Sequence, residues 1–322
     1  MQAIFSSIFS IFIFVLIGFI ACRVNILPKE THAPLLSFVL NITTPCLILA
    51  SVNSSELNTK TFSNTIWTLV LTLVLFLIFS FVSLGLSRLM KKTSRDEKNV
   101  LSVAMLTCNS GFMGLPVSQA AFGPAIFYLM VIQNLAFNVY LFTGVVMQFH
   151  AGEKALIDKR QIFPAIRRLL KPLFSFSSVM SFVAIFFLFE HIRIPAYPAG
   201  ILEDIGNITV PLSMMIVGAQ LGTCNLVNVI SDWRLLYVSF CKLIVQPGLA
   251  LLLLYFLPIA DSVKLTLVLS FAFPAAVLGA ALAESENKDS TRMAEAVATS
   301  TVLSMATLPI WIIILGALFP LG

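Results

Sequence analysis

The stretch Thr107-Cys-Asn-Ser-Gly-Phe-Met-Gly-Leu-Pro116 interrupts a segment that is otherwise long and apolar enough to span a bilayer. Hydrocarbon offers no partners for free backbone N–H and C=O groups, so a broken helix is tolerated only where protein surrounds it or where it lines a watery cavity. Breaks of this kind form binding sites in membrane proteins. The stretch therefore predicts a membrane protein with a candidate binding site at residues 107–116.

The composition of the chain also indicates a membrane protein. Hydrophobic residues make up 58% of its 322 residues and charged residues 11%, whereas a soluble domain is about 25% charged. A spanning helix needs about 20 apolar residues, and ten stretches approach that length. These are 4–22, 33–53, 64–87, 99–122, 125–149, 172–190, 199–222, 233–256, 263–283 and 297–319. We expect an all-α integral membrane protein, with residues 1–322 forming a single membrane domain.

The basic residues predict the orientation of these helices. Sixteen of the 20 Lys and Arg residues fall in the odd-numbered connections, and basic residues near spanning helices favour the cytoplasmic side. We therefore expect cytoplasmic odd connections and extracytoplasmic termini in a multi-pass protein of the cell membrane, either a plasma or an inner membrane. Basic loops also suit contact with membrane lipid, and we expect no nucleic-acid partner.

A short motif occurs in the second helix of each five-helix half. It reads Asn41-Ile-Thr-Thr-Pro45 in the second span and Asn207-Ile-Thr-Val-Pro211 in the seventh, and Pro116 and Pro274 lie within the fourth and ninth spans. The offsets, 166 and 158 residues, differ by only eight. Because five is odd, the second half enters the membrane from the opposite side. This predicts a 5+5 inverted repeat in which broken helices 4 and 9 meet near the midplane. The repeats would cover about residues 1–150 and 172–322.

Proline and glycine predict the local geometry of the first break. Leu115 precedes a proline and is expected to leave the α region, whereas Gly111 and Gly114 can adopt positive φ at little cost. We expect the helix to unwind between about residues 110 and 115, and Pro116 to begin a second half-helix. A kink that only serves packing is the alternative.

Such a break would suit an anion. Free N–H groups at a helix start and the helix dipole attract negative charge, and the Asn109 amide can both donate and accept a hydrogen bond. The candidate substrate-binding residues are Asn109, Ser110, Gly111, Gly114 and Pro116 at the first break and Phe273, Pro274 and Ala275 at the second.

Lys242 is predicted to lie near the middle of a span. It follows Asp232 by ten residues, roughly 15 Å along a helix, where an unpaired lysine costs roughly 2.5–3.5 kcal/mol. Lys242 could attract an anion or pair with a carboxylate. The alternatives are hydrogen bonds to backbone carbonyls or Gln246, or a side chain that reaches the interface. No Asp or Glu lies comparably deep, so no carboxylate is available for proton or sodium coupling, and a potential that is negative inside would then drive anion efflux.

Asn134 and Asn138 lie one turn apart on the fifth span. We include both among the candidate substrate-binding residues. The alternative is that they form hydrogen bonds between helices, which is the commoner use of such residues.

The sequence argues against enzymatic and ATP-driven functions. A membrane enzyme would need a nucleophile with a base, or paired carboxylates, at membrane depth, and a primary pump would carry a phosphate-binding G-x-x-x-x-G-K-[ST] loop. Neither pattern occurs. The three histidines (His32, His150 and His191) are expected in connections, and the five cysteines have no metal-ligand spacing. We predict no catalytic residue, metal or cofactor.

Three short motifs, in this order along the chain, carry a family resemblance. They are Asn109-Ser-Gly-Phe-Met-Gly-Leu-Pro116 with Phe122-Gly123, Pro211 with Val217-Gly-Ala-Gln-Leu221, and Phe273-Pro274 with Ala298-Thr-Ser-Thr-Val-Leu-Ser-Met-Ala-Thr-Leu-Pro309. Over nearly its whole length the chain resembles the auxin efflux carrier family, which includes compact bacterial permeases and the plant PIN auxin exporters.

The resemblance implies a ten-helix homodimer. Helices 1, 2, 6 and 7 would form a scaffold, and helices 3–5 and 8–10 a mobile transport unit in which helices 4 and 9 cross at their prolines. Asn109 matches the asparagine that contacts the substrate carboxylate in the auxin exporters, whereas Ala275 and Ala276 stand where those proteins have more polar residues. The implied function is secondary transport of small organic anions, particularly carboxylates, by an elevator mechanism. A channel or a ligand sensor on the same scaffold is the alternative.

Overall fold

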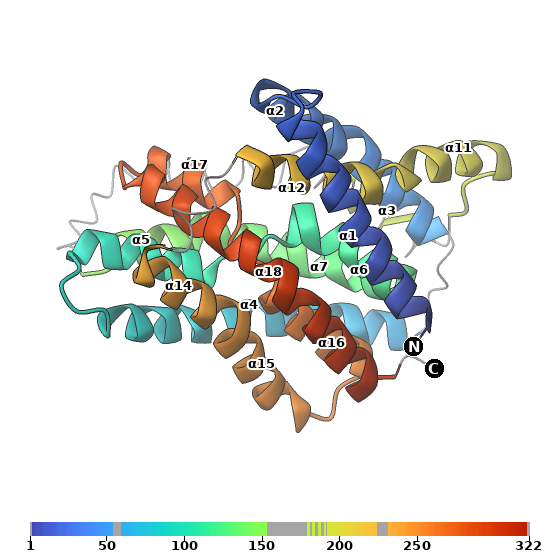
Figure 1. Cartoon of the computed structure of the whole chain (residues 1–322). Coiled ribbons are helices and arrows are strands. Elements are labelled where there is room, and N and C mark those ends of the chain that lie inside the picture. The colour runs from blue at the N-terminus through green and yellow to red at the C-terminus, as the bar shows by residue number, and fades with distance from the viewer. Residues whose placement is uncertain are drawn as a thin grey trace, which may run out of the picture.

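The computed structural model describes residues 2–53, 59–152, 192–223 and 231–320, with Val179, Met180, Phe182, Val183, Phe186, Phe187 and Glu190 between them. Within these ranges the chain forms α-helices and five-residue π-helical turns and contains no strand (Figure 1). Most of the predicted sixth span, 172–190, and most of the predicted connection 150–171 lie outside the described residues.

The helices follow nine of the predicted spans. In order they are α1 (Gln2–Arg23); α2 (Lys29–Phe38), η1 (Val39–Thr43) and α3 (Thr44–Asn53); α4 (Thr59–Arg88); α5 (Arg95–Leu106), η2 (Ser110–Gly114) and α6 (Leu115–Phe122); α7 (Pro124–Tyr140), η3 (Leu141–Val145) and α8 (Val146–Phe149); α11 (Ala196–Asn207) and α12 (Thr209–Thr223); α14 (Trp233–Phe240), η6 (Cys241–Val245) and α15 (Gln246–Tyr255); α16 (Asp261–Ala272) and α17 (Leu278–Ser285); and α18 (Ser290–Leu318). Among the described residues, seven continuous helical stretches are long and apolar enough to cross a membrane, and α1 contains a further apolar stretch, Phe9–Arg23.

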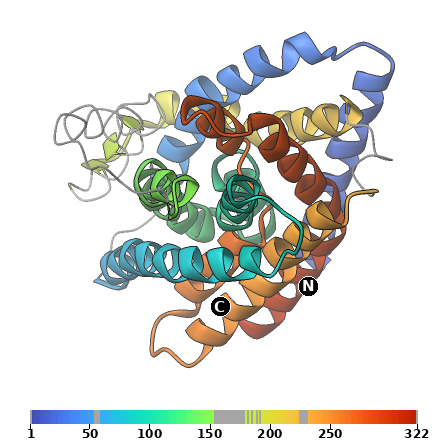
Figure 2. The same ribbon diagram turned by 90° about the vertical axis from the view of Figure 1, so that its left-hand side faces the viewer.

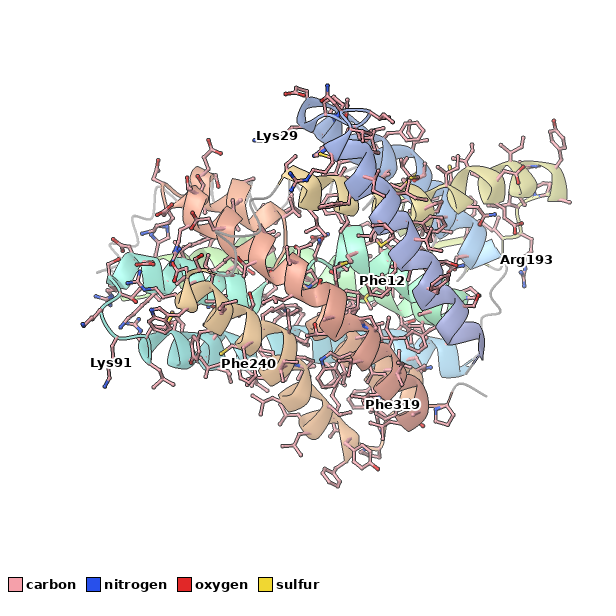
Figure 3. All side chains as sticks on the ribbon, in the orientation of Figure 1. Phe12, Lys29, Lys91, Arg193, Phe240 and Phe319 are labelled. Atoms are coloured by element: carbon pink, nitrogen blue, oxygen red, sulfur yellow. The ribbon has the colours of Figure 1, made fainter. Side chains whose placement is uncertain are left out.

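The distribution of side chains is that of a protein surrounded by lipid. Phe81, Phe240 and Leu252 lie within helices and are 69, 56 and 60% exposed, whereas the hydroxyls of Ser102 and Thr266 belong to fully buried residues. Figure 3 shows Phe240 on the flank of the molecule and Lys29, Lys91 and Arg193 toward its periphery. Lipid removes the penalty for an exposed apolar side chain, and buried polar groups then join helices by hydrogen bonds.

The helices pack in two sets. The first contains α1, α2, α3, α11 and α12, and the second contains α4 to α8 and α14 to α18. Glycine allows the closest approach in the first set, because a Cβ at Gly18 would collide with the Met215 carbonyl and a Cβ at Gly218 with that of Val15. Figure 1 shows α1, α2 and α12 above α15 and α16, and Figure 2 shows the same helices after a quarter turn. The two sets meet mainly where α1 and α12 contact α6, where α3 contacts α7 and where α1 contacts α18.

Three π-helical turns each end two residues before a proline. η1 precedes Pro45, η2 precedes Pro116 and η6 precedes Pro247. A proline inside an α-helix lacks an N–H, and its ring clashes with the carbonyl four residues earlier. A wider turn contains one extra residue and removes that clash. The sequence therefore continues as a helix through these prolines.

A cluster of charged side chains joins the starts of α5, α14 and α18. Glu97 Oε1 accepts hydrogen bonds from Arg234 Nη1 at 3.1 Å and from Arg292 Nε at 3.0 Å. Arg292 Nη2 donates to Asp232 Oδ2 at 2.7 Å, and Asp232 also caps α14 by accepting from the Arg234 N–H. The cluster therefore fixes three helix ends of the second set to one another.

The expectation that all three histidines lie in connections is wrong for His32. Helix α2 begins at Lys29, after an extended Pro28, so His32 lies within α2 and is 8% exposed. The predicted second span starts at residue 33, because the first turn of α2 is polar. His150 directly follows α8, and its Nε2 lies 3.2 Å from Glu286 Oε2. His191 lies outside the described residues.

Candidate functional site

The fourth predicted span is broken at Thr107–Asn109. Helix α5 ends at Leu106, Thr107 is extended (φ −68°, ψ 148°), and the helix resumes with η2 at Ser110. The prediction that the helix unwinds between 110 and 115 is therefore wrong. Gly111 and Gly114 lie in the π-helical turn, and Leu115 is helical (φ −59°, ψ −55°). The wide turn accommodates the ring of Pro116, so Leu115 need not become extended.

The two glycines of η2 permit close packing. A Cβ at Gly114 would lie 3.0 Å from Phe273 Cε2, and a Cβ at Gly111 would lie 3.5 Å from Asn134 Oδ1. The first distance is tighter than ordinary packing, whereas the second is a normal contact. Gly114 therefore lets the ring of Phe273, from the second break, rest against the backbone of the first.

The second break begins in the same conformation as the first. Helix α16 ends at Ala272, and Phe273 has φ −72° and ψ 151°, close to the values of Thr107. Helices α5 and α16 each contain 12 residues. Their first residues are 166 positions apart in the sequence (261 − 95), and so are their last residues (272 − 106). Thr107 and Phe273 thus follow the ends of these two helices in the same way. Pro274 follows Phe273 directly, whereas Pro116 follows Thr107 by nine residues, so the two prolines lie at different distances from these helix ends.

Backbone hydrogen bonds join the two breaks. The Asn109 N–H donates to the Pro274 carbonyl oxygen at 2.8 Å, and the Ala276 N–H donates to Thr107 Oγ1 at 3.3 Å. Each break thereby satisfies a buried polar group of the other, as broken backbone within a membrane requires. The two breaks form one structural unit.

Both breaks satisfy some backbone donors and leave others free. At the first, the Met113 and Gly114 N–H groups both donate to the Asn109 carbonyl, and the earlier N–H groups of η2 make no hydrogen bond with the described residues. At the second, the Ala275 N–H donates to Ser300 Oγ at 3.1 Å and the Ala276 N–H to Thr107, whereas the Val277 and Leu278 N–H groups make no hydrogen bond with the described residues. An anion would therefore find free backbone donors at the first break.

The Asn109 side chain lies at this free helix start. The residue is 4% exposed, and its amide is not among the fully enclosed polar groups that lack a hydrogen-bond partner. No hydrogen bond joins this amide to another described residue. Asn109 is therefore available to a ligand, whereas its backbone is held by Pro274. Phe273 and Ala275 are fully buried, and Pro274 is buried with them.

The remaining polar residues near the first break form a chain of contacts. Ser110 Oγ donates to Asn134 Oδ1 at 2.9 Å, and the Cys108 thiol donates to Ser110 Oγ at 3.8 Å. Gln133 Nε2 donates to Cys108 Sγ at 3.8 Å, and its Oε1 is buried without a partner. Asn134 thus forms the interhelical bond that was its alternative role, and Asn138 is partly exposed. Sequence reasoning missed Gln133, although a buried amide beside Asn134 in an apolar helix was a usable signal.

Lys242 is completely buried and lacks a hydrogen-bond partner among the described residues. Its Nζ lies 5.5 Å from the centroid of the Phe271 ring. The amide of Gln246 is also buried with both polar atoms unpaired, so the alternative that Gln246 satisfies Lys242 is wrong. The side chain does not reach the surface either. Within the described part of the chain, the contact found for the Lys242 ammonium is a cation–π contact with the Phe271 ring.

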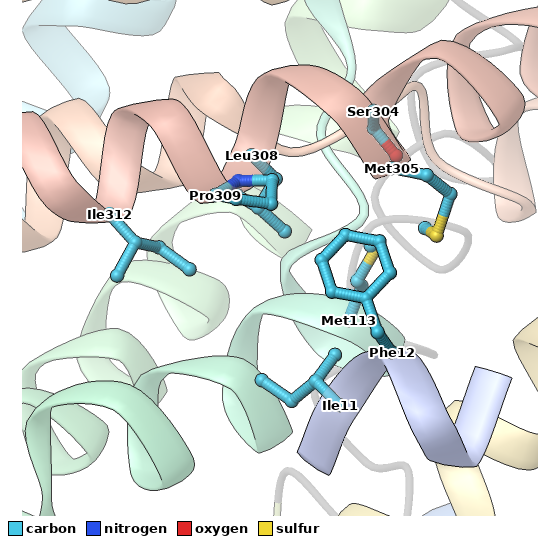
Figure 4. A pocket seen from close by; sticks show the side chains of 8 residues that line it. All are labelled: Ile11, Phe12, Met113, Ser304, Met305, Leu308, Pro309 and Ile312. Atoms are coloured by element: carbon cyan, nitrogen blue, oxygen red, sulfur yellow. The ribbon is translucent and has the colours of Figure 1, made fainter. Parts of the chain in front are cut away.

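A small apolar hollow lies beside η2, between α1 and α18 (Figure 4). Its lining consists of Ile11, Phe12, Met113, Ser304, Met305, Leu308, Pro309 and Ile312. Met113 is its single contact with the first break, and neither Asn109 nor Lys242 lines it. The hollow is therefore a gap at the boundary between the two helix sets, separate from the polar groups of the break.

Comparison with known proteins identifies the family. The family described as "Membrane transport protein" matches residues 3–312. An uncharacterized transporter of Methanothermobacter thermautotrophicus is 27% identical over 323 residues, which cover 96% of this chain and 97% of the relative. An uncharacterized transporter of Methanocaldococcus jannaschii is 27% identical over 311 residues, which cover 94% and 95%. The chain therefore belongs to the membrane transport protein family, which is the auxin efflux carrier family that its motifs resemble.

Proposed function

We propose that this protein is a secondary transporter that carries small organic anions, in particular carboxylates, across the cell membrane. The observation that carries the proposal is the Asn109 side chain, which belongs to a residue only 4% exposed and lies where the first N–H groups of η2 are free. A carboxylate oxygen would accept hydrogen bonds from the amide and from these donors. The helix dipole behind them adds a favourable interaction.

The architecture that we propose is a ten-helix 5+5 inverted repeat in one membrane domain. Two pairs of positions support it with one offset, because Pro45 and Pro211 are 166 residues apart, as are the ends of α5 and α16. The sixth helix would lie at about residues 172–190. The odd connections would face the cytoplasm, and both termini would be extracytoplasmic.

An elevator movement is the proposed mechanism. The scaffold would contain α1, α2, α3, α11 and α12 with the sixth helix, and the transport unit would contain α4 to α8 and α14 to α18. Both breaks and Lys242 belong to the second set, and the hydrogen bonds between the breaks lie within it. The substrate site would therefore move intact past the scaffold. The few contacts between the sets, and the apolar hollow between α1 and α18, suit sliding.

We also propose a homodimer in a lipid membrane. The family resemblance supports the dimer, and the exposed apolar helix surfaces support the lipid contact.

A thermal-shift screen of the purified protein against small carboxylates tests this function. We expect at least one carboxylate to raise the unfolding temperature of the wild type and to leave that of Asn109→Ala unchanged. Asn41→Ala is the matched control, because the Asn41 amide bonds to Ser37 within its own helix. An equal shift in Asn109→Ala and wild type would remove the first break from substrate binding.

A further inference from the structure

Lys242 is a buried ionisable residue close to the break that carries Asn109. Its Nζ has no hydrogen-bond partner among the described residues, and the Phe271 ring is 5.5 Å away. Cys108, which directly precedes Asn109, lies within electrostatic range of Lys242. A positive charge on Lys242 would therefore act on an anion bound at Asn109.

The helices packed around η6 provide no fixed counter-charge. These helices are α5, α14, α15, α16 and α18. Apart from Cys241 and the tyrosines Tyr237 and Tyr255, their titratable groups lie within two turns of a helix start: Arg95, Asp96, Glu97, Lys98, Arg234, Asp261, Lys264, Arg292 and Glu295. Glu97 and Glu295 bond to arginines, and Asp261 to Lys264. None of the described carboxylates pairs with Lys242.

This isolation links the charge of Lys242 to occupancy of the site. Burial without a partner shifts the balance from the ammonium toward the neutral amine, whereas an anion nearby stabilises the charged form. By thermodynamic reciprocity, carboxylate binding favours protonation of Lys242 to the same degree as protonation favours carboxylate binding. Binding of a carboxylate at Asn109 should therefore draw a proton onto Lys242, and protonation should tighten carboxylate binding.

We propose that Lys242 carries the coupling proton of this transporter, so that a carboxylate and a proton cross the membrane together. The inference rests on the proposed function and adds the coupling ion to it. The neutral amine accepts a proton from water on the side where the carboxylate enters and becomes an ammonium. No bond to the substrate forms. On the opposite side the carboxylate leaves, and the ammonium returns its proton to water.

A second observation supplies a route for the proton. Ser239, Lys242 and Gln246 recur along one side of α14, η6 and α15, and all three are fully buried. The Ser239 hydroxyl and both polar atoms of the Gln246 amide lack partners among the described residues. A line of unpaired polar atoms in an apolar helix is costly unless water or a mobile proton uses it. Ser239, the first of these three residues, follows Asp232 by seven positions, and Asp232 caps the start of α14.

The coupling changes the expected driving force. One negative and one positive charge cross together when the substrate has a single carboxylate, so the loaded step moves no net charge. The membrane potential then has little effect on that step, whereas a proton gradient drives accumulation of the substrate.

Proton uptake on binding is the direct test. A carboxylate that stabilises the wild type is added to purified protein in weakly buffered solution containing a pH indicator. We expect proton uptake that rises toward one proton per carboxylate bound as the pH is raised and more Lys242 is neutral before binding. Lys242→Arg should bind the carboxylate without uptake, because arginine stays protonated. Lys242→Met should show weakened binding and no uptake. Lys91→Met, which changes an exposed lysine (Figure 3), should behave as the wild type.

The outcomes separate this inference from the proposed function. Carboxylate binding that depends on Asn109 but takes up no proton would overturn the inference and leave the function standing. Undiminished uptake by Lys242→Arg would also overturn it, and that variant retains a cation should Lys242→Met fail to fold. If no carboxylate binds, both are overturned. In liposomes clamped at zero potential, accumulation driven by a pH gradient in the wild type and lost in Lys242→Arg would support the inference.

Discussion

The backbone N–H of Asn109 donates a 2.8 Å hydrogen bond to the carbonyl oxygen of Pro274, a residue 165 positions later in the chain (274 − 109). The bond holds the Asn109 backbone while its side-chain amide stays unpaired. The backbone N–H of Asn109 thus fixes the position of the residue, and its side-chain amide is available to a ligand. A binding group held in this way loses little conformational freedom when a ligand arrives.

Thr107→Val should destabilise the protein. Valine keeps the shape of threonine but removes the acceptor of the Ala276 N–H, and an unsatisfied buried donor costs about 1–3 kcal/mol. The unfolding temperature in detergent measures the effect. Thr107→Ser retains the hydroxyl and should lie closer to the wild type. Equal losses in the two variants would mean that the methyl group, rather than the hydrogen bond, is responsible.

Gly114→Ala should also destabilise the protein, because the added methyl would lie 3.0 Å from the Phe273 ring. Overpacking in a dense core costs about 1–3 kcal/mol. Gly85→Ala is the matched control, since no atom lies within 4 Å of the added methyl, and alanine favours a helix by about 1 kcal/mol over glycine. Unfolding temperatures should therefore move in opposite directions. A stable Gly114→Ala with normal substrate binding would contradict the close packing of the two breaks.

Acid should weaken the cluster at Asp232. Burial raises the pKa of the Asp232 carboxyl, but hydrogen bonds from Arg292 and from the Arg234 backbone, with the positive charges of both arginines, lower its pKa below the usual value. Its stabilising contribution is therefore present above the unfolded pKa of about 3.9 and is lost as pH falls through the lower folded value. We expect Asp232→Asn to reduce the unfolding temperature at pH 7. The corresponding loss in the free energy of unfolding should be below about 1 kcal/mol, because the carboxylate is partly solvated.

The difference between Asp232→Asn and the wild type should shrink as the pH approaches 3. Asp261→Asn is a suitable control, since Asp261 is 53% exposed and pairs with a single lysine. A difference that stays constant from pH 7 to pH 3 would show that the charge of Asp232 does not stabilise the cluster.

Counterflow in liposomes distinguishes a carrier from a channel or a sensor. Vesicles loaded with an unlabelled carboxylate should transiently accumulate the labelled compound against its gradient, because a carrier returns loaded. Asn109→Ala should abolish the accumulation. Single-channel currents would identify a channel, and binding without flux would identify a sensor.

Cross-linking α1 to α18 should stop transport if the two helix sets slide past each other. Phe12 and Met305 come from these helices and line the same hollow (Figure 4). In a background without native cysteines, Phe12→Cys with Met305→Cys should be joined by a flexible bis-maleimide, and substrate flux should fall to background. Each single variant treated with the reagent is the control. Full flux in the cross-linked protein would contradict an elevator movement at this boundary.

Apolar length predicted the helices well, because hydropathy depends on composition rather than on neighbours. The span predicted at 64–87 is α4 (Thr59–Arg88), and the one predicted at 125–149 ends at Phe149. The position of the first break was harder to predict. Leu115 stays helical because a π-helical turn precedes Pro116, a feature that the Gly and Pro pattern does not specify.

The state of each polar group depended on contacts distant in sequence. The Ala275 N–H is satisfied by Ser300, from another helix, and no local pattern indicates that pairing. Lys242 is the converse case. Its depth could be counted from Asp232, but the absence of a partner among the described residues required the packing of η6. Sequence therefore indicates which residues are unusual, and tertiary packing determines which of them remain available.

The residues before Pro45, Pro116 and Pro247 all keep helical angles: Thr44 has φ −63° and ψ −47°, Leu115 has φ −59° and ψ −55°, and Gln246 has φ −66° and ψ −51°. The helix therefore continues through each of these prolines without a hinge, because the wide turn before each proline accommodates its ring. If the transport unit bends at all during its cycle, the bend must occur at Thr107–Asn109 or at the start of the second break, where the backbone is already extended. Asn109, which would bind the substrate, would then lie at the point where the backbone bends during transport.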